Sequence, residues 1–143
     1  MGRLALAPLL AVVVTACALH PRPRSSEDRA GPNSVEISAA QIERSGASTV
    51  WDALQIHVKN TVFAEDGYGT PQRVRRRGSS TVHLFEDMPI YIDHVQLADV
   101  RLLRDMPARE VERIRVLTGF DATTYYGTGA GDGVILIFTR GGS

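Results

Sequence analysis

Apolar and polar positions along the chain first form a regular pattern near residue 35. Val35 to Ile37 has the composition of a short strand, and Ser38 followed by Gln41 is a capping-box pattern that predicts a helix beginning at Ala39. Gly46 can adopt the left-handed conformation that commonly ends a helix. The folded part of the chain is therefore expected to open with a strand followed directly by a short helix.

A second helical pattern covers residues 50–59, and Ser48 or Thr49 can cap it. Four apolar side chains fall on one face of this helix: Val50, Trp51, Leu54 and Val58. The opposite face is polar, so we expect the helix to pack against a core along one side.

The apolar pattern fades over residues 60–78, where two glycines and a proline interrupt it, and this segment is predicted to be a loop. Residues 80–92 then predict two strands around a turn at 86–89. Val82 and Leu84 belong to the first strand, and the β-branched and aromatic run from Ile90 to Ile92 forms the second.

Residues 102–119 predict a brief helical turn, begun by Asp105 and Pro107, and then a strand. The period of two in this strand is clear from Arg113 onward. Residues 121–126 predict a further short helix, which Asp121 can cap and Gly127 can close.

The last pattern is an unbroken apolar run from Val134 to Phe138. Such a run predicts a strand that is buried on both faces, and hence a central strand. Strands and short helices follow one another without a regular βαβ alternation. The fold class is therefore predicted to be α+β, a small mixed β-sheet of about four or five strands with short helices packed on it.

A glycine-rich segment, YYGTGAGDG, precedes this last strand. A dinucleotide fingerprint needs a strand before the glycines and a helix after them, whereas here a helix precedes and a strand follows. No lysine follows the glycines, as a phosphate-binding P-loop would require. We interpret the glycines as structural backbone positions and expect no nucleotide cofactor; they are Gly119, Gly127, Gly129, Gly131 and Gly133.

The N-terminus has the character of an export signal. One cation, Arg3, precedes an apolar run from Leu4 to Val14, which is shorter than the roughly 20 residues of a membrane span but matches a signal-peptide core. The run ends in Val-Thr-Ala-Cys and resembles the lipobox of bacterial lipoproteins. That resemblance implies cleavage of residues 1–16 and a lipid on Cys17, the single cysteine. The alternative is an ordinary signal peptide that contains a cysteine.

Residues 17–34 are rich in proline, serine and charge, and we expect the lipidated Cys17 and a flexible tether here. The folded domain is then predicted to cover residues 35–143. Ala18, rather than an aspartate, follows the cysteine, which in the lipoprotein pattern favours the outer membrane.

Net charge and composition exclude several function classes. The 143 residues have a formal net charge of zero, so the chain has no general attraction for nucleic acid. A local basic run could contact anionic lipid headgroups, although a solvated loop is the simpler interpretation. It consists of Arg73, Arg75, Arg76 and Arg77.

Candidate chemistry is sparse. The histidines at 57, 83 and 94 are not spaced as metal ligands, and Cys17 is assigned to the lipid. Nothing in the spacing of the serines, histidine and aspartates that could be combined into a triad supports one; they are Ser79, Ser80, His83, Asp87 and Asp93. We therefore expect no catalytic residue, metal or cofactor.

A longer motif runs from residue 107 to 139. It reads Pro-x-x-x-Val-Glu-x-Ile-x-Val-Leu-x-Gly from Pro107 to Gly119, then Tyr126-Gly127, then Gly-Val-Ile-x-Ile-x-Thr from Gly133 to Thr139. This motif resembles the conserved half of the plug domain of TonB-dependent outer-membrane receptors. Residues 37–55 are similar to the opening strand and helices of that domain, so the resemblance covers most of the folded part.

The resemblance implies a plug-like fold and a role by contact rather than catalysis. The family's Asp-Gly turn is Asp93-His94 here, and Asp93 joins the arginine run as a candidate interaction residue. The sequence ends at Ser143, where a receptor would begin its barrel, so we expect a plug-like module without a barrel of its own. The expected function is that of a non-enzymatic, periplasm-facing lipoprotein of the bacterial outer membrane, with a β-barrel or an energy-coupling protein as partner. The alternative is a periplasmic lipoprotein that binds a siderophore or a carbohydrate.

Overall fold

The structure, a computed structural model, describes residues 34–78 and 87–142. The elements that come before residue 79 are β1 (Ser34–Ser38), α1 (Ala39–Ser45), α2 (Val50–His57), β2 (Thr61–Glu65) and β3 (Pro71–Arg76). Those after residue 86 are β4 (Ile90–Ile92), β5 (Val95–Gln96), α3 (Leu102–Asp105), η2 (Ala108–Glu110), β6 (Val111–Leu117), α4 (Phe120–Tyr126), η3 (Thr128–Ala130) and β7 (Val134–Thr139). The expected signal peptide, Cys17, residues 18–33 of the tether and the strand around Val82 and Leu84 lie outside the described residues.

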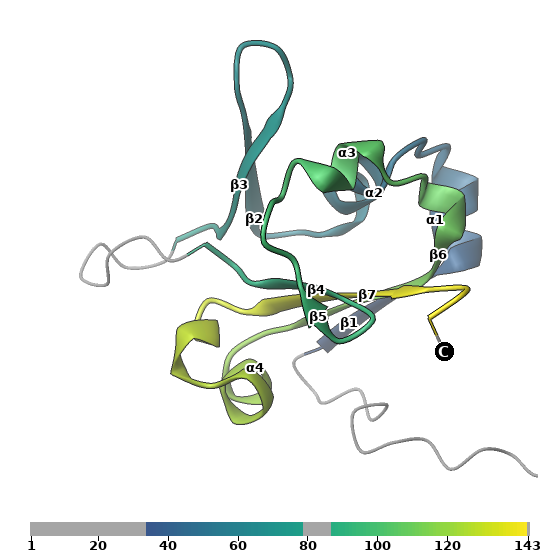
Figure 1. Ribbon diagram of the computed structural model, residues 1–143. Helices are drawn as coiled ribbons and strands as arrows, with labels where there is room; N and C mark the ends of the chain where they lie inside the picture. Colours follow the sequence, from purple (N-terminus) through teal and green to yellow (C-terminus); the bar gives the residue numbers. More distant parts are fainter. Residues whose placement is uncertain (1–33, 79–86, 143) are drawn as a thin grey trace, which may run out of the picture.

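A five-stranded sheet organises the molecule, with the strand order β1-β6-β7-β4-β5 (Figure 1). Strand β6 is antiparallel to both β1 and β7, while β4 is parallel to β7, so the sheet is mixed. The prediction of an α+β fold with a small mixed sheet and short helices is confirmed. Strand β7 lies in the middle of the order, as its unbroken apolar run predicts.

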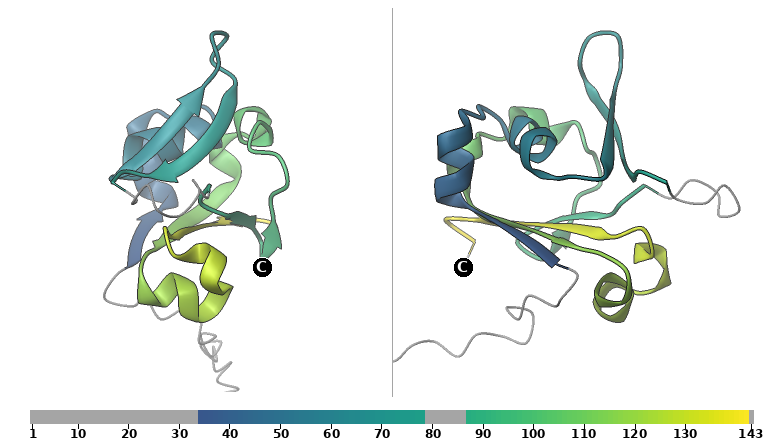
Figure 2. Two further views of the ribbon diagram at one scale, coloured as in Figure 1. Left: turned by 90° about the vertical axis from the view of Figure 1, so that its left-hand side faces the viewer. Right: turned by 180° about the vertical axis from the view of Figure 1, so that it is seen from behind.

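Elements cover both faces of this sheet (Figures 1 and 2). Helices α1, α2 and α3 lie on one face, and α4 with η3 lies on the other. Ile135 and Ile137 of β7 belong to the larger core under the first three helices, whereas Val134 and Leu136 belong to a smaller core under α4. Because successive residues of a strand point to opposite faces, this strand contributes to both cores.

The first two helices begin where the capping signals predict. The Ser38 amide donates to Gln41 Oε1 over 2.8 Å, and Gly46 ends α1 with φ 72°. Thr49 Oγ1 accepts from the Asp52 amide over 3.1 Å and caps α2. Helix α2 ends at His57 rather than at residue 59, because Val58 takes an extended conformation and is itself buried in the core.

The predicted loop over residues 60–78 is wrong, because most of it is an antiparallel hairpin of β2 and β3 (Figure 2). Phe63 of β2 lies opposite Val74 of β3, and both side chains pack on the core. The Phe63 ring meets the Trp51 ring of α2 edge to face, with 5.2 Å between centroids. This cross-strand pair anchors the hairpin. The positions two residues away from it on each strand are polar, so no apolar period appears in the sequence; they are Thr61, Glu65, Gln72 and Arg76.

A simple alternation of apolar and polar residues would expose every polar side chain of β6 to solvent, but one of them is buried. Arg115 is only 2% exposed, and it pairs with Glu36 on the neighbouring strand β1, with 2.8 Å between the guanidinium and the carboxylate. A charged side chain can be buried when it is paired and hydrogen-bonded.

Helix α4 also starts differently from the prediction. Its N-cap position is Gly119, so Asp121 lies within the first turn and its side chain makes no capping hydrogen bond. An acidic residue in the first turn is still favoured by the helix dipole. The expected end at Gly127 is observed, with φ 81°.

Candidate functional site

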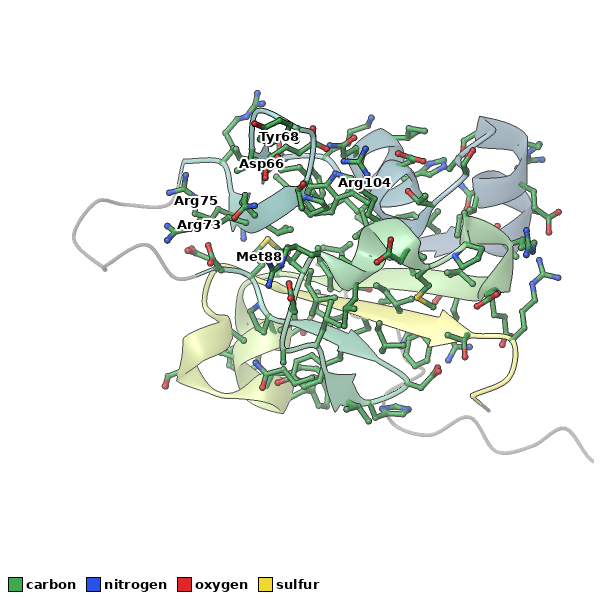
Figure 3. All side chains as sticks on the ribbon, turned by 45° about the horizontal axis from the view of Figure 1, so that its top comes forward. Asp66, Tyr68, Arg73, Arg75, Met88 and Arg104 are labelled. Atoms are coloured by element: carbon green, nitrogen blue, oxygen red, sulfur yellow. The ribbon has the colours of Figure 1, made fainter. Side chains whose placement is uncertain are left out.

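The arginine run does not form one patch, because three of its members belong to strand β3. Arg73 and Arg75 pair in register with Ala64 and Val62, and they alternate with the buried Val74, so they extend from the outer face of the hairpin (Figure 3). Arg76 has the opposite orientation and lines a cavity near the sheet. Arg77 follows the strand and is exposed. The structure therefore keeps Arg73 and Arg75 together and separates them from Arg76.

Asp93 stabilises the structure of the tight turn between β4 and β5. Both turn residues have positive φ, 45° at Asp93 and 70° at His94. The Asp93 carboxylate accepts hydrogen bonds from the Thr139 amide over 2.8 Å and from its hydroxyl over 2.6 Å. These bonds tie the turn to the end of β7.

The five glycines fall into two groups. Gly119, Gly127 and Gly133 have positive φ, of 60°, 81° and 115° respectively, whereas Gly129 and Gly131 do not. A Cβ atom at Gly133 would lie 2.8 Å from the Leu117 carbonyl oxygen and 3.0 Å from the Met88 methyl carbon. The glycine at this position lets the chain pass close to β6 before it enters β7.

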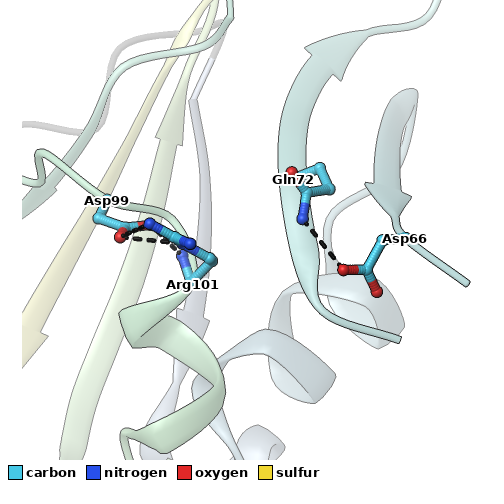
Figure 4. Close-up of polar contacts among 4 residues, drawn as sticks. All are labelled: Asp66, Gln72, Asp99 and Arg101. Atoms are coloured by element: carbon cyan, nitrogen blue, oxygen red, sulfur yellow. Dashed lines mark hydrogen bonds and ion pairs between the residues drawn. The ribbon is translucent and has the colours of Figure 1, made fainter. Parts of the chain in front are cut away.

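The tip of the β2–β3 hairpin is organised by Asp66. Its carboxylate accepts from the amides of Tyr68 over 2.9 Å and Thr70 over 2.8 Å. The Thr70 hydrogen bond, together with the weaker contribution from Tyr68, lowers the pKa of Asp66 below its ordinary value of 3.8. Tyr68 is 92% exposed at this tip, and Gln72 reaches Asp66 over 3.4 Å (Figures 3 and 4).

A polar cavity of about 290 Å³, called here the hairpin cleft, lies between β3 and residues 96–100. Its polar lining comes from Gln72, Arg73, Asp87, Gln96 and Asp99. Asp99 forms an ion pair of 2.7 Å with Arg101, which lowers the pKa of Asp99 and raises that of Arg101 (Figure 4). The cleft thus offers hydrogen-bond donors and acceptors, of which the Asp99 carboxylate is held by Arg101.

Two features are absent from residues 34–78 and 87–142, a metal-binding cluster and a membrane-spanning helix. No three His, Cys, Asp or Glu side chains lie where they could together hold a metal ion. No helix in this part of the chain has the length and apolar character needed to cross a bilayer. Cys17 and His83 fall outside the described residues.

Sequence reasoning missed the residues of the hairpin tip and cleft. Asp66 followed by Gly67 is a hairpin-turn signal, and it lies between two segments that each contain inward apolar residues. That signal could have revealed the hairpin. The approach of Gln96 and Asp99 to β3 has no counterpart in the sequence pattern.

Comparison with known proteins gives a consistent result. Residues 27–134 match the family model of the TonB-dependent receptor plug domain, while no curated protein matches the chain. A variant of the ferric enterobactin receptor from Pseudomonas aeruginosa is 26% identical, with a TM-score of 0.55 over 78% of this chain and 18% of that chain.

Two further solved structures have the same fold. The siderophore receptor PirA from Pseudomonas aeruginosa is 25% identical, with a TM-score of 0.51 over 78% of this chain and 19% of that one. The RagAB peptide importer is 21% identical, with a TM-score of 0.58 over 75% of this chain and 12% of that one.

This chain therefore spans less than a fifth of the length of these three relatives. The family match, by contrast, covers most of its residues, and the mixed sheet with its short helices agrees with the fold of the relatives. The chain belongs to the TonB-dependent receptor plug domain family.

Proposed function

We propose that this chain is a non-enzymatic plug module of the bacterial outer membrane, anchored by lipid, that faces the periplasm and works by protein contact. Its partner is an outer-membrane β-barrel or an energy-coupling protein. The observation that carries the proposal is the family match over residues 27–134, which includes the described elements from β1 to the start of β7. The names of the similar solved structures, two receptors and an importer, support a connection with uptake.

The lipid anchor rests on the lipobox-like run that ends at Cys17. Two acyl chains hold a protein at a membrane where one is marginal. Cells given radiolabelled palmitate are expected to label the wild-type chain and not the Cys17→Ala variant, which should also leave the membrane fraction. Label retained by the variant, or absent from both chains, would contradict the anchor.

The protein contact can be tested on α4, where two aromatic side chains are exposed. Phe120 is 77% exposed and Tyr125 is 53% exposed. Exposed apolar surface of this kind often marks an interaction site, and tyrosine and phenylalanine are enriched there. We assign this surface to contact with the β-barrel.

Co-purification from detergent-solubilised outer membranes is the direct experiment. The tagged wild-type chain is expected to recover a β-barrel protein, and the Phe120→Ser, Tyr125→Ser double variant to recover much less. Thr124→Ser, an exposed position on the same helix, is the matched control and should behave like the wild type. The proposal fails if the wild-type chain recovers no barrel or energy-coupling protein.

The hairpin cleft favours a second candidate, a periplasmic binding function for a siderophore or a carbohydrate. Its amides, carboxylates and Arg73 could hydrogen-bond the hydroxyl groups of such a ligand. A panel of ferric siderophores and oligosaccharides should raise the melting temperature of the wild-type chain and not of Gln72→Ala. If no ligand in the panel stabilises the wild-type chain, this candidate loses its support.

A further inference from the structure

A second cavity, called here the β1–β6 cavity, has a volume of about 190 Å³. It lies where β1 and β6 meet the connection between α2 and β2. Its apolar walls come from Val35, Val58, Met88 and Val116. Met88 lies between the hairpin and the sheet in Figure 3. An apolar cavity of about 150 Å³ is large enough to bind benzene, so this one can enclose a ring-sized apolar group.

Basic side chains line part of the same cavity. Lys59 and Arg76 are two of its lining residues, and Asp132 is the carboxylate among the lining residues described. Lys59 is exposed, and its Nζ donates to the Ile56 carbonyl over 2.7 Å, which holds the ammonium near the end of α2. The charges around the cavity therefore favour an anion.

His57 adds an observation that is independent of charge. It lines the cavity, and its Nε2 atom is buried without a hydrogen-bond partner among residues 34–78 and 87–142. A buried polar atom without a partner costs free energy. Because this nitrogen is buried, a carboxylate in the cavity reaches it only if the His57 ring turns toward the cavity.

We propose that the β1–β6 cavity binds small organic carboxylates that have a compact apolar body, such as an aromatic ring. The body fits among the four apolar residues, and the carboxylate lies at the side of Lys59 and Arg76. This site shares no residue with the α4 surface and only Met88 with the hairpin cleft, and it does not depend on a membrane partner. A negative result for the barrel contact would therefore not contradict this proposal, and the absence of carboxylate binding would not contradict the barrel contact.

Benzoate and its neutral counterpart benzyl alcohol are suitable probes, because they share a ring and differ in charge. The full chain can be labelled at the methionine methyl groups and titrated by NMR. Met88 lines this cavity and also the hairpin cleft, whereas Met106 lines neither and serves as an internal control. Lys59 lines only the β1–β6 cavity, so the Lys59→Glu variant decides which cavity the ligand occupies. We expect benzoate to shift the Met88 signal with a dissociation constant on the order of 1 mM, which is ordinary for so small a ligand. Benzyl alcohol should bind about fivefold more weakly.

Charge reversal at the rim provides the matched comparison. Lys59→Glu is expected to weaken benzoate binding about fivefold and to leave benzyl alcohol unchanged. Arg44→Glu makes the same change of charge at an exposed cation that does not line the cavity. It should leave the affinity for both ligands unchanged. Equal affinity for the two probes would overturn the carboxylate assignment. The absence of any saturable shift at Met88 would overturn the site itself.

Discussion

At the scale of single residues, Gly133 has the most constrained backbone of the glycine-rich segment. Its φ of 115° and the nearby Leu117 carbonyl leave no room for a Cβ atom. Gly133→Ala should lower the free energy of unfolding by about 3 kcal/mol, as measured in urea. Gly131→Ala is the control, because Gly131 has φ −56° and a Cβ atom there would lie 3.6 Å from the Thr128 carbonyl oxygen, an ordinary contact. Similar losses in the two variants would contradict the assigned constraint.

The Arg115–Glu36 pair supplies a second test at this scale. Glu36→Ala removes the carboxylate from a guanidinium that is almost fully buried, and it should cost about 1–2 kcal/mol. Glu43→Ala breaks the exposed pair with Arg140 and should change the stability by less than about 0.5 kcal/mol. Thermal unfolding of both variants measures the difference, and a larger cost at position 43 would be inconsistent with it.

Single residues also show which features can be predicted from the sequence and which cannot. The need for glycine before β7 follows from the order of helix, glycines and strand. The burial of Arg115 does not follow from any local pattern, because it depends on Glu36, which is far away in the sequence and adjacent only after β1 pairs with β6. Likewise, Asp93 has the sequence position of a surface turn residue, yet its carboxylate binds Thr139 of β7.

At the scale of elements, the β2–β3 hairpin depends on the contact between Phe63 and Trp51. Phe63→Ala removes the ring that meets α2 and should lower the free energy of unfolding by about 2–3 kcal/mol. Val62→Ala, on the outer face of the same strand, should change it by less than about 0.5 kcal/mol. Hydrogen exchange of the β3 amides would show the hairpin loosening in the first variant alone. Equal protection in both variants would mean that the ring contact does not hold the hairpin.

The hairpin tip has a predicted pH dependence. The pKa of Asp66 is lowered in the folded chain, so the hydrogen bonds to Tyr68 and Thr70 are present above the ordinary value of 3.8 and are lost as the pH falls through the lowered pKa. The amide shifts of these two residues, followed by NMR, should titrate with a midpoint below 3.8. Asp66→Asn should abolish the titration, and a midpoint above 3.8 would contradict the assignment.

The elements that were predicted correctly share a strong local signal. Capping residues mark the start of α1 and α2, and an unbroken apolar run marks β7. The hairpin was missed because the residues two positions away from Phe63 and Val74 are polar, which leaves no apolar period in either strand. Its stability comes from packing on α2, which is a tertiary effect.

At the scale of the whole molecule, the family and the α+β fold follow from the motif over residues 107–139, because most of its specified residues lie in strands β6 and β7. The cavities do not follow from it. The hairpin cleft joins β3 to residues 96–100, and the β1–β6 cavity joins β1 and β6 to the α2–β2 connection. Both arise only from the way in which the hairpin lies over the sheet.

The central claim is that this plug domain works in contact with an outer-membrane β-barrel. Site-specific photo-crosslinking in living cells tests it most directly, with the photoreactive residue at position 120 or 125 of α4, where the native side chains are exposed. The account predicts an irradiation-dependent adduct with a heat-modifiable barrel protein in the outer-membrane fraction. A folded chain in that fraction that forms no barrel adduct at either position would contradict it.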